Sequence, residues 1–263
     1  MKKLSKIYLA LVMLFLYAPI FVLIVFSFNT TKSRSVISGF TLDWYVKLFH
    51  NELILGSLLN TIIVAVCASV FATILGTAAA IGINNMKKLP KTLVLQGTNI
   101  PIINPEIVTG VSLMLLFVFF TVRMNVQMGF VTLIIAHITF DVPYVILNIM
   151  PKFRQMNPNL YEAAQDLGCN PVSAFFKVVL PEILPGVVSG FLMSFTFSLD
   201  DFVVSYFTSG TTQTLPITIY SMTRRKVSPE INALSTIIFL VVVAVVVINQ
   251  IIERKTNMKK GVK

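Results

Sequence analysis

Residues 157–186, NPNLYEAAQDLGCNPVSAFFKVVLPEILPG, form a polar and amphipathic stretch in a chain otherwise dominated by long apolar runs. Asn157 has the side chain of a helix cap, and Pro158 suits a first helical position. Gly168 is typical of a helix C-terminus because glycine takes the left-handed conformation that closes a helix. The first part of the stretch therefore predicts a helix that starts at Asn157–Pro158 and ends at Gly168.

The second part of the stretch repeats the start signal. Asn170 and Pro171 again place a capping side chain before a proline. The apolar residues that follow fall mostly on one helical face: Val172, Phe175, Phe176, Val178 and Val179. Pro181 restricts the residue before it, so we expect this second helix to end there. The stretch as a whole predicts two short helices in a cytoplasmic loop at about residues 151–183.

Composition indicates that this loop connects membrane spans. The chain has 263 residues, of which 56% are hydrophobic and only 12% are charged, and its mean hydropathy is +0.83. This leaves too little polar surface for a water-soluble globule, and a helical crossing needs about 20 apolar residues. We predict an all-α polytopic membrane protein with a single domain over 1–263 and six spans, at about 7–28, 57–83, 99–122, 129–150, 184–207 and 232–252.

The net charge of +10 follows the expected topology rather than a nucleic-acid surface. With both termini in the cytoplasm, 14 of the 21 Lys and Arg residues fall on the inner side. They are Lys2, Lys3, Lys6, Lys87, Lys88, Lys91, Lys152, Arg154, Lys177, Arg254, Lys255, Lys259, Lys260 and Lys263. The positive-inside rule therefore favours this orientation, and no nucleic-acid partner is expected.

The spacing within the cytoplasmic loop carries a family resemblance. It matches the pattern E-A-A-x3-G-x9-I-x-L-P, with valine in place of isoleucine, at Glu162, Ala163, Ala164, Gly168, Val178, Leu180 and Pro181. The loop thus resembles the EAA loop of ABC importer permeases of type I. The resemblance implies that these residues form a coupling helix, which docks on a cytoplasmic ATPase subunit. The alternative to a coupling helix is an ordinary amphipathic cytoplasmic loop.

Acidic residues inside the predicted spans are the second departure from ordinary membrane sequence. Asp200 and Asp201 lie in the fifth span within FSLDDFVVSYF, next to Phe202 and Tyr206. A carboxylate at a bilayer centre costs roughly 2.5–3.5 kcal/mol on insertion scales, so such residues tend to mark a wet pathway. Because adjacent helical residues are about 100° apart, we expect only one of the two aspartates to face that pathway.

Two further spans contain polar residues for which we keep both a structural and a functional interpretation. The third span opens with prolines at 101 and 105, both expected to break the helix, and Glu106 follows. Glu106 either benefits from the helix dipole or lines a pathway or gate. In the fourth span His137 and Asp141 are four residues apart, which would allow them to hydrogen-bond each other. No metal-ligand spacing is present, and neither a catalytic nor a metal site is predicted.

The last outer loop breaks the charge bias locally. It contains Arg224, Arg225 and Lys226, which form either a solvated basic patch or a docking surface for an acidic partner. Here the segments SLDDF, LPITIYSM and RRKVSPEINAL resemble the PotC-type permeases of spermidine/putrescine importers. With the EAA-like loop, this resemblance covers most of the chain.

The resemblance implies the permease subunit of an ATP-driven polyamine importer. Its implied partners are a second related permease, a pair of ATPase subunits and an extracytoplasmic binding protein, besides the lipid bilayer and the polyamine. The sequence contains no G-x-x-x-x-G-K-[ST] phosphate loop, so ATP and Mg would be used by the partner ATPase and this chain would hold no cofactor and be no enzyme. The substrate pathway would include Asp200, Asp201, Glu106, Tyr206 and Phe202.

Three alternatives remain open on the sequence. An importer permease for another small solute would share the coupling loop. A self-contained secondary transporter would use the intramembrane acids for a coupling ion, and inverted repeats, which are not evident, would support it. A non-transporting membrane scaffold would need neither the loop nor the acids.

Overall fold

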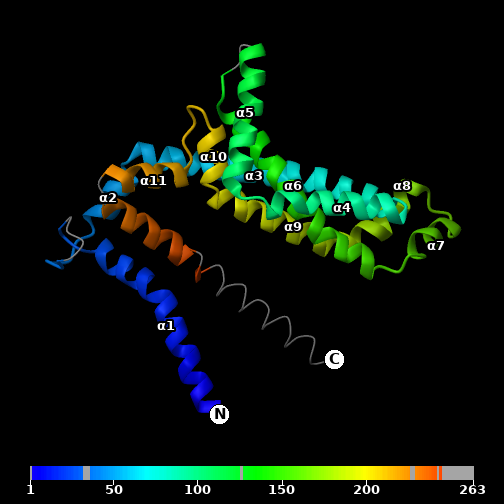
Figure 1. The fold of residues 1–263 in the computed structure, drawn as a ribbon. Helices are drawn as coiled ribbons and strands as arrows, with labels where there is room; N and C mark the ends of the chain where they lie inside the picture. The colour runs from blue at the N-terminus through cyan, green and yellow to red at the C-terminus, as the bar shows by residue number, and fades with distance from the viewer. Residues whose placement is uncertain (1, 32–35, 125–126, 226–228, 242, 245–263) are drawn as a thin grey trace. The chain divides into compact units, whose positions relative to one another are not determined.

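Helices form all the named elements of the structure, a computed structural model that describes residues 2–31, 36–124, 127–225, 229–241 and 243–244. The elements are α1 (Lys2–Ser27), α2 (Asp43–Phe49), α3 (Glu52–Asn84), α4 (Lys88–Ile103), α5 (Glu106–Met124), α6 (Phe130–Gln155), α7 (Leu160–Asp166), α8 (Pro171–Ala174), the π-helical turn η1 (Phe175–Val179), α9 (Leu180–Asp200), α10 (Val203–Thr208) and α11 (Leu215–Arg225). The predicted all-α class is confirmed (Figure 1).

Five helices in the described part of the chain are long and apolar enough to cross a membrane. They are Lys6–Ser27, Glu52–Asn84, Glu106–Arg123, Phe130–Gln155 and Pro171–Asp200. A shorter apolar helix, Pro229–Val241, begins where the sixth span is predicted, and residues 245–252 of that span lie outside the described residues. The chain is therefore a multi-pass membrane protein, and the helices at the third and fifth predicted spans begin and end at other residues than the predicted spans do.

The chain divides into two compact units, of which the first combines its two ends: Met1–Leu55 with Ile219–Lys263. In this unit the indole nitrogen of Trp44 donates to the backbone oxygen of Asn29 (2.7 Å), and the Asn51 amide donates to Glu230 (3.0 Å). Phe28 stacks on Phe40 with ring centroids 5.3 Å apart. These contacts hold the segment after α1 against α2.

The second unit, Gly56–Thr218, is a bundle in which α3, α4, α6 and α9 run side by side (Figure 1). Glycines let the helices approach closely. A Cβ on Gly186 of α9 would lie 2.9 Å from the Asn148 backbone oxygen, and one on Gly190 would lie 3.2 Å from Val145 Cα. From α3, Gly76 faces the Val145 side chain in the same way. The buried core of the unit is centred on α6.

The third predicted span contains one helix break, whereas the sequence predicts two, at Pro101 and Pro105. Pro101 lies inside α4 and does not break it, whereas α4 ends at Ile103 and α5 begins at Glu106. The Asn104 backbone is extended, as expected for a residue before proline. In Figure 1, α5 points away from the direction of α4. The membrane-length helix therefore starts at Glu106 rather than near residue 99.

The polar stretch at 157–186 forms the predicted turn at Gly168, but its helices begin and end at other residues than the sequence predicts. Gly168 has φ +88°, its N–H bonds to the Gln165 oxygen, and the next N–H, of Cys169, bonds to Ala164. This is the glycine-closed helix end that the sequence predicts. The helix before it begins at Leu160, not at Pro158, because Asn157 instead forms a turn and accepts the N–H of residue 159.

The second predicted helix does not stop at Pro181. Asn170 caps α8 by accepting the Ser173 N–H at 2.7 Å, as expected. The helix then passes through η1 and continues into α9, with the Leu180 N–H bonded to the Phe175 oxygen. A proline in an α-helix clashes with the carbonyl four residues earlier, and the wider π turn before Pro181 accommodates the ring. The helix that contains the fifth predicted span therefore starts at Pro171, well before residue 184.

Candidate functional site

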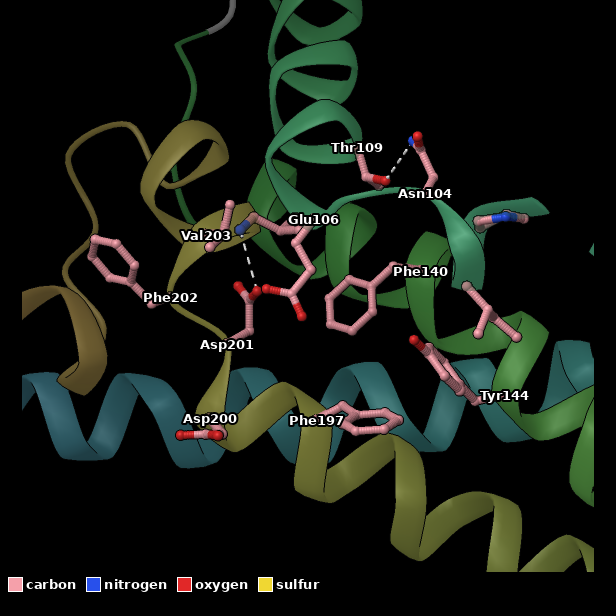
Figure 2. A pocket seen from close by; sticks show the side chains of 13 residues that line it. Asn104, Glu106, Thr109, Phe140, Tyr144, Phe197, Asp200, Asp201, Phe202 and Val203 are labelled. Atoms are coloured by element: carbon pink, nitrogen blue, oxygen red, sulfur yellow. Dashed lines mark hydrogen bonds between the residues drawn. The ribbon is translucent and has the colours of Figure 1, made fainter. Parts of the chain in front are cut away.

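Two interruptions between helices face α6 and enclose a cavity of about 310 Å³. One is the α4–α5 break at Asn104–Pro105, and the other is the α9–α10 break at Asp201–Phe202. The cavity is lined by Pro101, Ile102, Asn104, Glu106, Thr109, Phe140, Tyr144, Phe197, Asp200, Asp201, Phe202, Val203 and Val204 (Figure 2). All of these residues belong to the second unit.

Three carboxylates line this cavity. Glu106 is the first residue of α5, Asp200 is the last residue of α9, and Asp201 follows it directly. Glu106 and Asp200 are exposed, and within the described part of the chain neither makes a hydrogen bond or ion pair. In Figure 2, Glu106 and Asp201 are directed into the same space, while Asp200 points away from them. The cavity wall therefore carries negative charge that the described protein leaves largely uncompensated.

Aromatic rings form another part of the wall. Phe140 and Tyr144 come from α6 and Phe197 comes from α9, with the Tyr144 and Phe197 ring centroids 4.5 Å apart. Phe202 lines the cavity from the α9–α10 break and contacts Tyr206, whose ring centroid is 5.5 Å away. Aromatic faces attract cations through their quadrupole, and carboxylates attract them by charge. The cavity is thus suited to a cation with an apolar body.

Asp201 also has a structural role at the break. Its carboxylate accepts the backbone N–H groups of Val204 (3.2 Å) and Ser205 (2.6 Å), which are free at the start of α10. It therefore caps α10 from outside the helix, and the Val204 contact is drawn in Figure 2. The sequence predicts that only one of the two aspartates faces the pathway, whereas both line this cavity, Asp201 held by these bonds and Asp200 exposed. The two differ because a helix break separates them from α10, and not because of the 100° step of a continuous helix.

A buried hydrogen-bonded network lies behind this wall. The hydroxyl of Ser198 donates to Asp141 at 2.8 Å and lies 3.0 Å from His137 Nδ1. On the other side of the ring, His137 Nε2 lies 3.0 Å from the Ser205 hydroxyl and 3.6 Å from Asp201 Oδ2. The expected direct bond between His137 and Asp141 is wrong, because Ser198 of α9 bridges them. The network joins α6, α9 and α10.

The structure brings together four of the five predicted pathway residues, Glu106, Asp200, Asp201 and Phe202. Tyr206 does not line the cavity; it is exposed and contacts the pocket residue Phe202. The sequence argument missed the aromatic wall from α6 and the roles of Ser198 and Ser205. A usable signal was the i, i+4 pair Phe140 and Tyr144 on either side of Asp141, since such a pair shares one helix face.

The EAA-like residues lie at the opposite end of α9 from the cavity, from α7 to the first two residues of α9 (Figure 1). Glu162, Ala163, Gly168 and Pro181 are exposed, Val178 and Leu180 are half-buried, and Ala164 is buried. Beside them three apolar side chains are strongly exposed, Leu167 (87%), Val172 (66%) and Phe176 (59%). This end of the unit therefore presents an apolar surface next to the motif.

The predicted basic patch is described only in part. Arg224 is exposed, and its guanidinium lies 5.4 Å from the centroid of the Tyr220 ring. Arg225 ends α11, and Lys226 lies outside the described residues. Arg224 is the part of the patch that the structure places at the surface.

Comparison with known proteins identifies the family. Residues 72–257, more than two thirds of the chain, match the family described as "Binding-protein-dependent transport system inner membrane component". The chain is 38% identical to the spermidine/putrescine transport system permease protein PotC of Haemophilus influenzae, over 97% of this chain and 98% of that protein. It is 36% identical to PotC of Escherichia coli K12 (94% and 93% covered) and 37% identical to the putrescine transport system permease protein PotI of the same strain (85% and 81%).

Solved structures agree on the fold. A bacterial ABC transporter that imports the acidic polysaccharide alginate aligns with a TM-score of 0.70 at 13% identity, covering 96% of this chain and 95% of that chain. An amino acid ABC transporter aligns with a TM-score of 0.54 at 21% identity, covering 82% and 99%. At these identities the likeness concerns the fold alone. The chain therefore belongs to the inner-membrane permease family of binding-protein-dependent ABC importers.

Proposed function

We propose that this chain is the permease subunit of an ATP-driven importer of polyamines, and that the cavity between the α4–α5 and α9–α10 breaks receives the substrate. The single observation that carries this proposal is the set of three carboxylates, Glu106, Asp200 and Asp201, beside a wall of aromatic rings. A polyamine is a flexible chain of methylene groups and ammonium groups. The carboxylates match its charges, and the rings match both its cationic and its apolar parts.

The printed names of the relatives support the same substrate class, since they concern spermidine and putrescine. An importer permease for another solute would share the fold and the family. It would have no need for three carboxylates at one cavity, because charged side chains within membrane-spanning segments are costly and are kept where they serve a substrate or ion path. The pocket chemistry therefore favours a polycation over a neutral or anionic solute.

Partners supply the functions that this chain lacks. We infer that a pair of ATPase subunits uses ATP and Mg, that a second related permease completes the translocation path, and that an extracytoplasmic binding protein delivers the polyamine. In this assembly, residues 1–263 act as one transmembrane permease domain. The surface near Arg224, Arg225 and Lys226 would attract acidic residues of the binding protein.

The end of α9 that carries the EAA-like residues is the proposed coupling site. Leu167, Val172 and Phe176 expose large apolar side chains there, and a cleft of an ATPase subunit would bury them. Because α8, η1 and α9 form one continuous helical run to Asp200, a displacement of the coupling end has a direct route to the cavity. This requires both termini and the loop 151–183 to be cytoplasmic.

The function is tested by uptake into vesicles that contain the full importer. We expect ATP-dependent accumulation of labelled spermidine or putrescine, and strong loss of uptake when Asp200 and Asp201 are both replaced by asparagine while assembly remains intact. Import of a neutral or anionic solute in place of polyamine, by an equally assembled complex, would contradict the proposal. Replacement of ATP by a non-hydrolysable analogue provides the background rate.

The orientation has its own test. The sequence contains two cysteines, Cys67 in α3 and Cys169 in the loop between α7 and α8, and both are free thiols in the structure. In a Cys67→Ala variant, a membrane-impermeant maleimide should label Cys169 in inverted vesicles and leave it unlabelled in intact cells. The reverse pattern would exclude the proposed topology.

A further inference from the structure

The buried imidazole of His137 contacts groups on each side of the α9–α10 break, next to the cavity but not in its lining. The side chain is fully buried in α6. Its Nδ1 lies 3.0 Å from the hydroxyl of Ser198, in the last turn of α9, and its Nε2 lies 3.0 Å from the hydroxyl of Ser205, in the first turn of α10. One ring therefore joins the two helices that the break separates.

The directions of these hydrogen bonds follow from the number of protons. Ser198 has one hydroxyl proton, and it goes to Asp141 Oδ2 at 2.8 Å. The contact between Ser198 and His137 Nδ1 must then be an N–H donated by the ring, because the serine oxygen can only accept. Asp141 thus fixes the ring through Ser198, which leaves Nε2 as the nitrogen that faces Ser205 and Asp201.

Asp201 is the pocket residue nearest to this network. Its Oδ2 accepts the Ser205 N–H at 2.6 Å and lies 3.6 Å from His137 Nε2, so one oxygen meets both the cap of α10 and the imidazole. If the link from His137 to Ser205 is lost, the first turn of α10 loses its attachment to α6 at this point. The cap and the direction of the Asp201 carboxylate would change with it.

We propose that His137 is a positioning residue of the substrate pocket. Through its contact with Ser205 it holds the first turn of α10 in place, and it thereby fixes the Asp201 carboxylate on the cavity wall. The inference rests on the proposed function, because it assigns a purpose to the orientation of Asp201. His137 itself does not touch the substrate. Its effect is transmitted through Ser205 and the cap of α10.

Two amides of different length test the two ends of the ring separately. In His137→Asn the amide can reach Ser198 and is too short to reach Ser205, whereas in His137→Gln it extends toward Ser205 and Asp201. Both variants keep a buried polar group, so a general loss of folding affects them alike. Ser69→Ala, which removes another fully buried hydroxyl in α3 that bonds only within its own helix, is the matched control.

The readout is the number of polyamine molecules imported per ATP hydrolysed, in vesicles with the complete importer and loaded binding protein. A merely structural role would reduce transport and ATP hydrolysis together and leave this ratio unchanged. We expect the ratio to fall by up to about tenfold in His137→Asn, which is the range for the loss of one hydrogen bond to an uncharged hydroxyl such as that of Ser205. It should stay close to the wild-type value in His137→Gln and in Ser69→Ala.

A double variant checks that the effect passes through Ser205. Ser205→Ala removes the hydroxyl but keeps the N–H that caps against Asp201, so it should lower the ratio less than His137→Asn does. Combined with His137→Asn it should add nothing, because both changes interrupt one link. Independent, multiplying effects, or an unchanged ratio in His137→Asn, would overturn the inference. Absence of polyamine import by the wild-type importer would instead refute the proposed function.

Discussion

At both ends of α9 the helix departs from what the breaking residues in the sequence predict, and it does so in opposite directions. At its N-terminal end the chain contains Pro181, yet the helix continues backward through the π turn Phe175–Val179 into α8. At its C-terminal end neither proline nor glycine is present, yet the helix stops at Asp200. The difference shows that a helix ends where other groups satisfy its backbone, and not simply where a breaking residue stands.

The two ends also differ in how their polar groups are held. At the cavity end the backbone of α10 is capped by Asp201, which the buried His137 network supports. At the EAA-like end the polar groups are exposed, and the apolar side chains Leu167 and Phe176 face outward. One end is preorganised around charge, and the other presents a surface that a partner must cover. We expect substitutions at the two ends to impair transport in different ways.

The largest effect should come from separating α9 from α6, because both ends depend on that contact. In Gly186→Leu the new Cβ would lie 2.9 Å from the Asn148 backbone oxygen, and overpacking of this kind costs about 1–3 kcal/mol or more. We expect little assembled protein in the membrane, measured by blotting and size-exclusion chromatography in detergent. Gly82→Leu is the control, since nothing lies within 4 Å of a Cβ at that position.

The second prediction concerns the cavity end. Removing charge by Asp200→Asn together with Glu106→Gln leaves the cap of α10 intact, because Asp201 is untouched. We expect normal assembly and an uptake rate that falls about tenfold or more, on the scale of a lost charged contact. Asp201→Ala should reduce uptake and also lower the free energy of unfolding by about 1 kcal/mol, as the loss of a helix cap does.

For each of these two predictions, one outcome would contradict the proposed role of the residue. If the Asp200 and Glu106 double variant imports polyamine at the normal rate, the cavity is not the substrate route. If Asp201→Ala leaves the free energy of unfolding unchanged, the carboxylate is not needed as a cap, and the contrast between a fixed Asp201 and a free Asp200 would not hold.

The third prediction concerns the coupling end. Gly168 has φ +88° with open space around it, so a side chain there strains the backbone by roughly 1–2 kcal/mol without a steric clash. Gly168→Trp should therefore assemble in the membrane but place a bulky group on the docking surface. We expect loss of ATP-driven uptake, while ATPase activity no longer responds to loaded binding protein.

The variant Gly168→Ala separates the effect of backbone strain from the effect of side-chain bulk. It carries the backbone strain without the bulk, so it should retain more uptake than the tryptophan variant. Normal uptake by an assembled Gly168→Trp complex would remove the coupling role. Glu162→Lys, which reverses an exposed charge in the same segment, should also reduce coupling without preventing insertion.

The smallest effect is expected for an exposed charge that has no buried network behind it. Arg224→Glu should weaken the stimulation of ATPase activity by loaded binding protein severalfold at most, since exposed pairs contribute about 0–1 kcal/mol. The difference from wild type should shrink with added salt, because the screening length at physiological ionic strength is about 8 Å. Unchanged stimulation at low salt would argue against docking at this surface.

The sequence by itself determined the class of the molecule and its local signals. Long apolar runs require membrane-spanning helices, since lipid offers the backbone no hydrogen bonds. The closure of α7 at Gly168 and the cap of α8 at Asn170 were predictable because each depends on residues only a few positions apart. The EAA spacing and the acidic pair at 200–201 likewise marked both functional ends of α9.

Tertiary structure alone decided where α9 begins and ends and what surrounds the acids. The π turn before Pro181 places Val179 and Ile183 in the core with α6. No local sequence pattern predicts the stabilisation that this burial provides. The break after Asp200 depends on Asp201, which lies between α9 and α10, on Ser205 of α10 and on His137 of α6. The contacts of His137 with α9 and α10 join residues more than 60 positions apart, so their energy enters only when the helices pack, and that packing overrides local propensity.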